Sequence, residues 1–209
     1  MIKILIIDDH QLLREGVKKI LREETDFIVA GEASNGPEAL NFIMKNEVDV
    51  IILDITLPGQ NGIELIKSIK KITQKPKILI FSMHPEDRFA VRALKSGAFG
   101  YLTKESASEE LVNAIRKIYS GHKYISMNLA EQLAQEIDDE YKPIHNFLSD
   151  REFEVFRLIA SGKKVSYIAD KLSLSVPTVN TYRARILEKM RMKSNVELTH
   201  YALKNDLLD

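Results

Sequence analysis

Three aspartates follow apolar, β-branched runs, where their carboxylates could hold a metal ion or accept a chemical group. Asp8 and Asp9 come after the run Lys3–Ile7, and Asp54 comes after the run Val48–Leu53. Because ligands of an open parallel sheet bind beyond the carboxyl ends of its strands, we expect the three carboxylates to share one pocket. Each aspartate alone could simply cap a helix, but three together are tolerated chiefly around a hard cation such as Mg²⁺.

Two further residues at the ends of strand-like runs suit the binding of a phosphoryl group. Ser82 follows Lys77–Phe81 and offers a hydroxyl, and Lys104 follows Gly100–Thr103 and offers a fixed positive charge for an anion. A lysine that faces three carboxylates completes a site able to hold both a metal ion and a transferred phosphoryl group.

The elements that would position these residues alternate along the first 120 residues. Segments such as Leu12–Leu21, Pro37–Met44 and Leu111–Tyr119 carry apolar residues at helical spacing. They lie between five strand-like runs, Lys3–Ile7, Phe27–Ala33, Val48–Leu53, Lys77–Phe81 and Gly100–Thr103. Five repeats of strand and helix predict an α/β fold, a doubly wound five-stranded parallel sheet.

Composition limits the class of protein. The 209 residues are 44% hydrophobic, enough for packed cores, and no apolar run approaches the roughly 18 to 20 residues of a membrane helix. The N-terminus lacks the layout of a signal peptide, so we expect a cytoplasmic protein with no membrane partner. The absence of cysteine excludes disulfides, thiol catalysis and cysteine zinc sites.

The charges are balanced overall but uneven along the chain. Residues 157–193 contain nine Lys/Arg and two Asp/Glu, whereas residues 127–147 contain one Lys and five Asp/Glu. A local basic stretch is typical of a nucleic-acid-binding element. The pattern predicts three regions: an α/β domain over 1–120, a linker with a short helix near Leu129–Ile137 over 121–146, and a second domain over 147–209.

The second domain should be all-α and contain a helix-turn-helix. After Leu148 there is no strand-like run, only helical segments near 150–160, 165–172, 177–190 and 195–204. Ser149 and Glu152 form a capping-box pattern, while Ser175 can cap the third segment with Pro177 in its first turn. Two helices joined by a short turn, the second rich in arginine and hydroxyl residues, are typical of DNA binding.

A helical wheel divides the third segment into two faces. Val179, Ile186 and Met190 share the core side. The opposite face can offer polar and methyl groups to base edges, and it contains Pro177, Asn180, Thr181, Ala184, Arg185 and Glu188. Further basic residues suit phosphates, namely Lys189, Arg191 and Lys193. A solvated basic helix in an ordinary bundle is the alternative on these features alone.

Residues 2–120 resemble the receiver domain of two-component response regulators, a flavodoxin-like fold. The matching features are Ile7-Asp8-Asp9-His10, Asp54 with Leu57-Pro58 and Asn61-Gly62, Ser82, and Gly100-Tyr101-Leu102-Thr103-Lys104. The resemblance implies that a sensor histidine kinase phosphorylates Asp54, and that Mg²⁺ is bound by Asp9, Asp54 and the backbone carbonyl of Thr56, with Asp8 assisting through water. It also implies that Ser82 and Lys104 hold phosphoryl oxygens and that Tyr101 is a rotamer switch. Met83 departs from the small residue often found there, and its bulk could slow hydrolysis.

Residues 148–209 resemble the LuxR-type helix-turn-helix of NarL/FixJ response regulators. The matching residues are Leu148-Ser149-Asp150-Arg151-Glu152, Ile168-Ala169, Leu172, Ser175, Thr178-Val179 and Ile186-Leu187-Glu188-Lys189-Met190. The resemblance implies that the unphosphorylated receiver masks the recognition helix and that phosphorylation favours a homodimer on double-stranded DNA, with Asn195–Lys204 as the dimer surface. The expected DNA-binding residues are Thr178, Asn180, Thr181, Arg183, Ala184, Arg185, Lys189 and Lys193.

The recognition segment departs from its relatives on the reading face. Asn180-Thr181-Tyr182 stands where many members have Lys, a variable residue and His, and Arg183 replaces a usual apolar residue. Arg183 lies near the core edge of the wheel, so we expect its stem to pack and its head to reach a phosphate. The target sequence therefore cannot be transferred from relatives.

Two other functions are compatible with parts of the pattern. One is a metal-assisted phosphatase, but the haloacid dehalogenase type needs a second aspartate two residues after its nucleophile, where this chain has Thr56. The other is a protein–protein signalling module whose helices bind a partner instead of DNA. We expect a regulator that is no enzyme apart from slow self-dephosphorylation.

Overall fold

The computed structural model describes residues 1–105, 108–127, 129–131, 133 and 143–208. The chain forms two compact units, Met1–Gln135 and Glu136–Asp209, which are described separately. Their division lies within the predicted linker. In the described part of the chain, no helix is long and apolar enough to cross a membrane.

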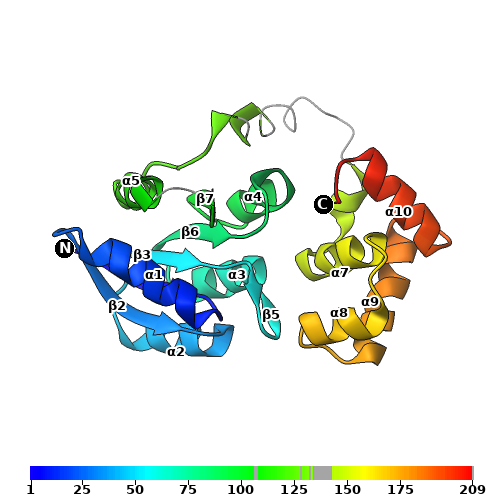
Figure 1. The fold of residues 1–209 in the computed structure, drawn as a ribbon, viewed down its shortest axis with the longest axis horizontal. Helices are drawn as coiled ribbons and strands as arrows, with labels where there is room; N and C mark the ends of the chain where they lie inside the picture. The colour runs from blue at the N-terminus through cyan, green and yellow to red at the C-terminus, as the bar shows by residue number, and fades with distance from the viewer. Residues whose placement is uncertain (106–107, 128, 132, 134–142, 209) are drawn as a thin grey trace. The chain divides into compact units, whose positions relative to one another are not determined.

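The first unit is the predicted doubly wound α/β fold (Figure 1). Its sheet has the parallel order β2-β1-β3-β6-β7. The strands are β1 (Ile2–Ile7), β2 (Phe27–Ala33), β3 (Val50–Leu53), β6 (Lys77–Ser82) and β7 (Gly100–Thr103). The helices are α1 (Gln11–Arg22), α2 (Gly36–Lys45), α3 (Gly62–Ile72), α4 (Glu86–Lys95) and α5 (Ser108–Tyr119). The order reverses between β1 and β3, which creates a crevice at their carboxyl ends.

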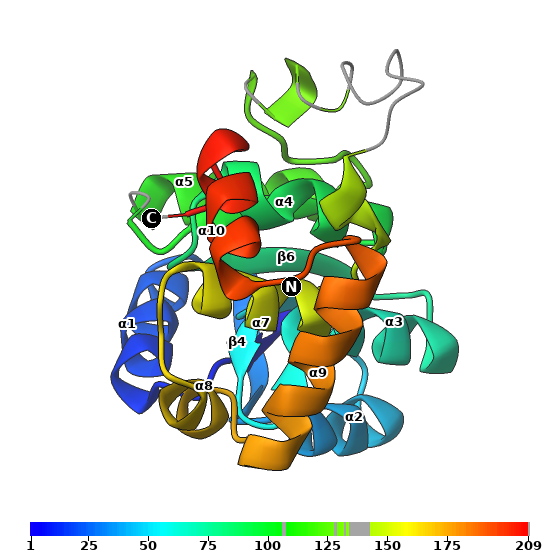
Figure 2. The same cartoon turned by 90° about the vertical axis from the view of Figure 1, so that its right-hand side faces the viewer.

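The central strands are buried on both faces because helices cover each side of the sheet. Ile4, Ile6, Ile52 and Leu79 belong to one apolar cluster with residues of α1 and α5. Figure 2 shows α1 and α3 on opposite sides of the sheet. This double coverage explains why β3 and β6 read as continuous apolar runs rather than alternating ones.

Two short strands were not predicted. β4 (Thr56–Leu57) and β5 (Gln60–Asn61) pair in antiparallel fashion directly after β3. Gly59 has a φ of 74° in the connecting turn, a conformation that glycine adopts without steric cost. Asn61 then caps α3 by accepting the backbone N–H of Ile63.

The chain continues along the sheet after α5. Tyr124 donates its backbone N–H to the carbonyl of Phe99 at 2.8 Å and forms a parallel bridge with Gly100, at the edge strand β7. Ser126 donates its hydroxyl to Glu86 at the start of α4. The helix predicted near Leu129–Ile137 lies largely outside the described residues.

The second unit is helical, as predicted. It consists of the 3-10 turn η1 (Ile144–Phe147) and helices α7 (Asp150–Ala160), α8 (Val165–Lys171), α9 (Val176–Lys189) and α10 (Asn195–Lys204). The predicted capping box of Ser149 and Glu152 begins α7, and Ser175 accepts the N–H of Thr178 to begin α9. α7 packs against both α9 and α10, and α8 packs against α9. Helix α7 therefore holds the last two helices of the unit together.

Candidate functional site

The carboxyl ends of the central strands bring the predicted site residues to one edge of the sheet. Ile7 is paired with Leu53, so Asp8 and Asp54 follow adjacent positions on β1 and β3. Ser82 ends β6, and its carbonyl accepts the backbone N–H of Lys104 at 2.8 Å. The parallel register therefore assembles residues that are up to 96 positions apart in the chain.

Lys104 bridges two of the three carboxylates. Its Nζ donates to Oδ2 of Asp8 at 2.6 Å and to Oδ2 of Asp54 at 2.7 Å. The three side chains are only 2–4% exposed, so water screens these contacts poorly. When all of these groups are charged, one lysine leaves two of the three aspartates without a compensating charge.

Burial sets the acidity of this pair. Burial raises the pKa of Asp54 above its ordinary value, and the nearby Lys104 only partly opposes this. Burial also lowers the pKa of Lys104, but Asp54 and Asp8 outweigh it, so that pKa lies above its ordinary value. The result is a carboxylate of increased basicity beside a firmly protonated amine, a combination typical of functional sites.

The donor set fits a hard divalent cation. Asp8, Asp9 and Asp54 each offer a carboxylate oxygen, and these oxygens lie within 4.8 Å of one another. The side chain of Asp9 is 30% exposed, so this ligand lies at the open side of the pocket. Oxygen ligands and uncompensated negative charge are what Mg²⁺ requires.

The loop after β3 holds the second oxygen of Asp54. Its Oδ1 accepts the backbone N–H of Thr56 at 3.2 Å. Gly62 packs so closely beneath this loop that an added Cβ would lie 2.3 Å from the Asp54 carbonyl oxygen. The glycine of the Asn61-Gly62 pair is thus required by backbone proximity.

His84 is a residue that sequence reasoning missed. Its Nε2 lies 3.2 Å from Oγ1 of Thr56, and its backbone N–H donates to Oγ of Ser82 at 3.2 Å. Its carbonyl accepts the hydroxyl of Tyr101 at 2.9 Å, with the Tyr101 ring buried. No periodic pattern marks a histidine two residues past a strand, so only its position near Asp54 suggests a role.

The buried and exposed faces of α9, the predicted recognition helix, agree with the helical wheel drawn from the sequence. Val179, Ile186 and Met190 are buried. The opposite residues are exposed, namely Pro177, Asn180, Thr181, Ala184, Arg185 and Glu188. This solvent-facing surface of α9 is hereafter the reading face.

Four of the expected DNA-binding residues also bond within the unit. Thr178 Oγ1 lies 2.7 Å from Oγ of Ser175, and Thr181 Oγ1 donates to the carbonyl of Pro177. Arg183 Nε donates to Oδ1 of Asn195 at 2.7 Å. Lys189 Nζ donates to Oε2 of Glu152 at 2.6 Å. These bonds orient side chains on and beside the reading face, and the roles of these residues toward DNA stay predictions.

Comparison with known families decides the class. Residues 4–116 match the family model described as "Response regulator receiver domain", and residues 146–202 match "Bacterial regulatory proteins, luxR family". The chain is a response regulator. With its receiver and LuxR-type regions, it belongs to the NarL/FixJ group of DNA-binding transcription regulators, which are not classical enzymes.

The similarity to two response regulators extends over nearly the whole of this chain. It is 39% identical to the response regulator UvrY of Escherichia coli K12 over 99% of this chain and 96% of UvrY. It is 37% identical to the response regulator GacA of Pseudomonas aeruginosa over 100% of this chain and 99% of GacA.

A solved structure is similar over nearly the whole chain. RcsB of Salmonella enterica serovar Typhimurium, bound to the promoter rprA with the phosphomimetic BeF₃⁻, is 26% identical with a TM-score of 0.65. The similarity covers 96% of this chain and 98% of the RcsB chain. The fold and class that the sequence predicted are therefore confirmed.

Proposed function

We propose that Asp54 accepts a phosphoryl group from the phosphohistidine of a sensor kinase. The observation that carries this proposal is the buried bridge of Lys104 between Asp8 and Asp54. A carboxylate oxygen of Asp54 forms a bond to phosphorus while the bond from phosphorus to the donor nitrogen breaks, and the donor imidazole keeps that electron pair. The increased basicity of the buried carboxylate favours its role as the nucleophile.

The surrounding residues would bind the transferred group. Lys104 would turn from Asp54 toward a phosphoryl oxygen, and the hydroxyl of Ser82 would donate to another. Asp9, Asp54 and the backbone carbonyl of Thr56 would hold Mg²⁺, with Asp8 assisting through water. Bound Mg²⁺ supplies positive charge that offsets the phosphoryl oxygens during transfer.

The switch would act through the loop before α4. An acyl phosphate adds about −1.5 to −2 charge at neutral pH and three acceptors, which would draw Ser82 toward Asp54. Ser82 and Tyr101 both bond to the backbone of His84, two residues before α4 begins. A shift of Ser82 would therefore change this loop, the Tyr101 rotamer and the face of α4 and β7. Slow self-dephosphorylation would reset the site.

The output would be DNA binding by the reading face. Asn180, Thr181, Ala184 and Arg185 would face base edges in the major groove, with Thr178 at the N-terminal end. Arg183, Lys189 and Lys193 would contact phosphates at the borders. The support is that this face is exposed and lies in the basic stretch 157–193.

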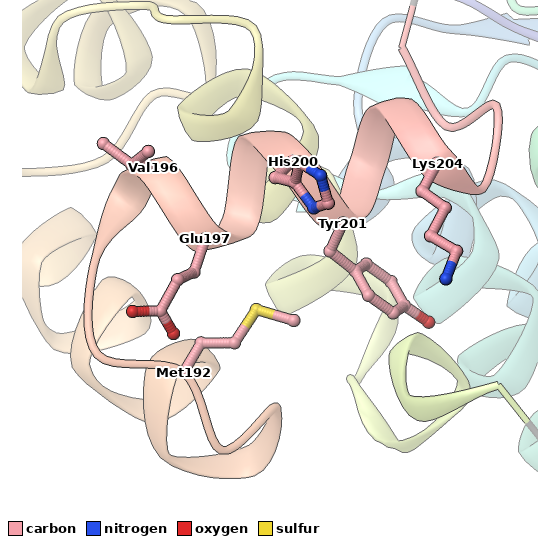
Figure 3. A pocket seen from close by; sticks show the side chains of 6 residues that line it. All are labelled: Met192, Val196, Glu197, His200, Tyr201 and Lys204. Carbon is pink, nitrogen blue, oxygen red and sulfur yellow. The ribbon is translucent and has the colours of Figure 1, made fainter.

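A homodimer would form on DNA when the receiver is phosphorylated. Figure 3 shows a hollow along α10, lined by Met192, Val196, Glu197, His200, Tyr201 and Lys204. Val196 and Leu203 are 77% and 61% exposed on the same helix, as expected of a surface covered in an assembly. One solved structure of RcsB is described as two dimers bound to two parallel DNAs. The proposal also includes masking of α9 before phosphorylation and a cytoplasmic location. It keeps the domain limits 1–120, 121–146 and 147–209.

Selection of DNA fragments with and without a small phosphodonor tests these steps together. We expect the phosphodonor and Mg²⁺ to enrich one sequence family strongly and D54N to show no such response. Equal enrichment with and without the phosphodonor would exclude control by phosphorylation. If no DNA is enriched in either state, the helices serve a protein partner instead.

A further inference from the structure

An imidazole faces the same pocket as the three carboxylates. Nδ1 of His10 lies 2.8 Å from Oδ1 of Asp9 and 3.3 Å from Oδ1 of Asp8. The backbone N–H of His10 also donates to Oδ1 of Asp8 at 2.7 Å, which fixes the start of the side chain. The ring is thus directed toward the pair of aspartates that follows β1.

The structure uses the two oxygens of Asp8 for different partners. Oδ2 binds Lys104, whereas Oδ1 faces His10. His10 is the N-cap residue of α1, but its side chain makes no capping hydrogen bond to that helix. The ring nitrogen is therefore not required for the helix start and is directed at the acidic site instead.

A small contraction of the cluster would let one ion contact all four side chains. One ligand atom from each of Asp8, Asp9, His10 and Asp54 lies within 4.8 Å of the others. Two ligands of one ion, each bound at about 2.1 Å, can lie no more than roughly 4.2 Å apart, so the set must contract by a few tenths of an ångström. The side chain of His10 is 66% exposed and can make that adjustment, whereas Asp8 and Asp54 are held by burial.

We propose that Nδ1 of His10 is a ligand of the divalent cation bound by Asp9 and Asp54, which shifts the selectivity of this site from Mg²⁺ toward transition metals. The inference rests on the proposed phosphoacceptor site. Imidazole suits later first-row cations, whereas Mg²⁺ keeps oxygen ligands and water. The ring binds as the tautomer that carries its proton on Nε2.

The proposal is tested by the ratio of the dissociation constants for Co²⁺ and Mg²⁺. Almost any site of nitrogen and oxygen ligands binds Co²⁺ more tightly than early divalent cations, so the affinity for Co²⁺ alone decides nothing. Isothermal titration of the untagged full-length chain with Co²⁺ and with Mg²⁺ gives both dissociation constants. We expect H10A to weaken Co²⁺ binding about tenfold and Mg²⁺ binding less than about twofold.

Two controls separate ligation from a general effect. H122A removes an exposed imidazole that bonds to Ser120, outside the site, and should leave both dissociation constants unchanged. H10N keeps a polar residue that favours helix N-caps, so it reports on the ring if H10A folds poorly. D9N should abolish Co²⁺ binding and so locate the ion.

A direct readout comes from proton NMR of the Co²⁺ complex. A ring bound through Nδ1 gives a strongly shifted, solvent-exchangeable Nε2 proton, expected in the unmodified chain and in H122A but not in H10A. The inference would be overturned if Co²⁺ binds at Asp9 without this signal and H10A leaves the selectivity ratio unchanged. In that case phosphorylation of Asp54 by acetyl phosphate with Mg²⁺ would still support the phosphoacceptor proposal. Failure of both metal binding and phosphorylation would overturn the two together.

Discussion

Lys104 and Asp54 are fifty residues apart in the chain, yet Nζ and Oδ2 lie 2.7 Å from each other with both side chains almost fully buried. Removal of the lysine leaves buried carboxylates without their counter-charge. We expect K104M to lower the free energy of unfolding of the receiver by about 3 kcal/mol, measured by urea denaturation followed by circular dichroism. D54N/K104M should lose less, because one uncompensated charge is gone. Equal losses in both variants would mean that the pair is energetically independent.

Gly62 is closely packed against backbone atoms, and Gly16, which has open space around it, is its control. A Cβ at Gly62 would lie 2.3 Å from the Asp54 carbonyl oxygen and 2.7 Å from Cα of Ile55, both in the backbone. We expect G62A to destabilise the receiver by about 2 kcal/mol and to slow phosphorylation, because the loop bearing Asp54 must move. G16A lies in α1 with nothing within 4 Å and should stabilise by up to about 1 kcal/mol. The same denaturation assay measures both, and a neutral G62A would refute the close approach.

The capping box should make the stability of helix α7 depend on pH. Burial raises the pKa of Glu152, but Lys189 and Ser149 outweigh it, so the folded-state pKa lies below the ordinary value. A lowered carboxyl pKa contributes stability above the unfolded pKa, and this is lost as pH falls through the folded value. We expect α7 amides to lose hydrogen-exchange protection upon acidification below about pH 4.5.

E152Q removes that titration and serves as the control. Its α7 amides should be less protected than those of the unmodified chain at neutral pH, with the difference shrinking in acid. S149A should cost about 1 kcal/mol at neutral pH through the lost cap. A constant difference between E152Q and the unmodified chain from pH 7 to pH 3 would contradict the lowered pKa.

Arg185 and Lys193 should affect DNA binding in different ways. Arg185 lies on the reading face, so R185A should cost about 1 to 3 kcal/mol on the preferred site and relax preference at one base pair. Lys193 lies beyond α9, so K193A should weaken binding to all sequences alike and reduce the salt slope by about one. Fluorescence anisotropy on matched and mismatched duplexes over a salt series distinguishes them. Identical salt slopes and specificity profiles for the two variants would exclude these roles.

Met83 should influence the lifetime of the phosphorylated state. Its side chain follows Ser82 and is 66% exposed, so its bulk can hinder approach of water from outside. We expect M83A to lose the phosphoryl group several-fold faster than the unmodified chain, measured by phosphate release after removal of the donor. M44A, an equally exposed methionine on α2, is the control. An unchanged rate in M83A would remove this role.

The sequence predicted most elements because their patterns are long. The limits predicted for β2 and β7 agree with the structure, and α7 and α10 begin and end at the predicted residues. β4 and β5 were missed because two-residue strands are too short to show periodicity. His84 was missed because its importance arises from the path of the loop after β6. The wheel identified the core of α9, but the contacts of Arg183 with Asn195 and of Lys189 with Glu152 depend on tertiary packing.

The bridge between Tyr124 and Gly100 affects where the receiver should be considered to end. The backbone of Tyr124 occupies part of the free edge of β7, and exposed strand edges are templates for pairing with other chains. Leu129, beyond the last predicted receiver residue, is 1% exposed. A receiver cut at residue 120 would therefore expose the outer edge of β7 and be prone to self-association, because the backbone around Tyr124 that covers this edge would be missing.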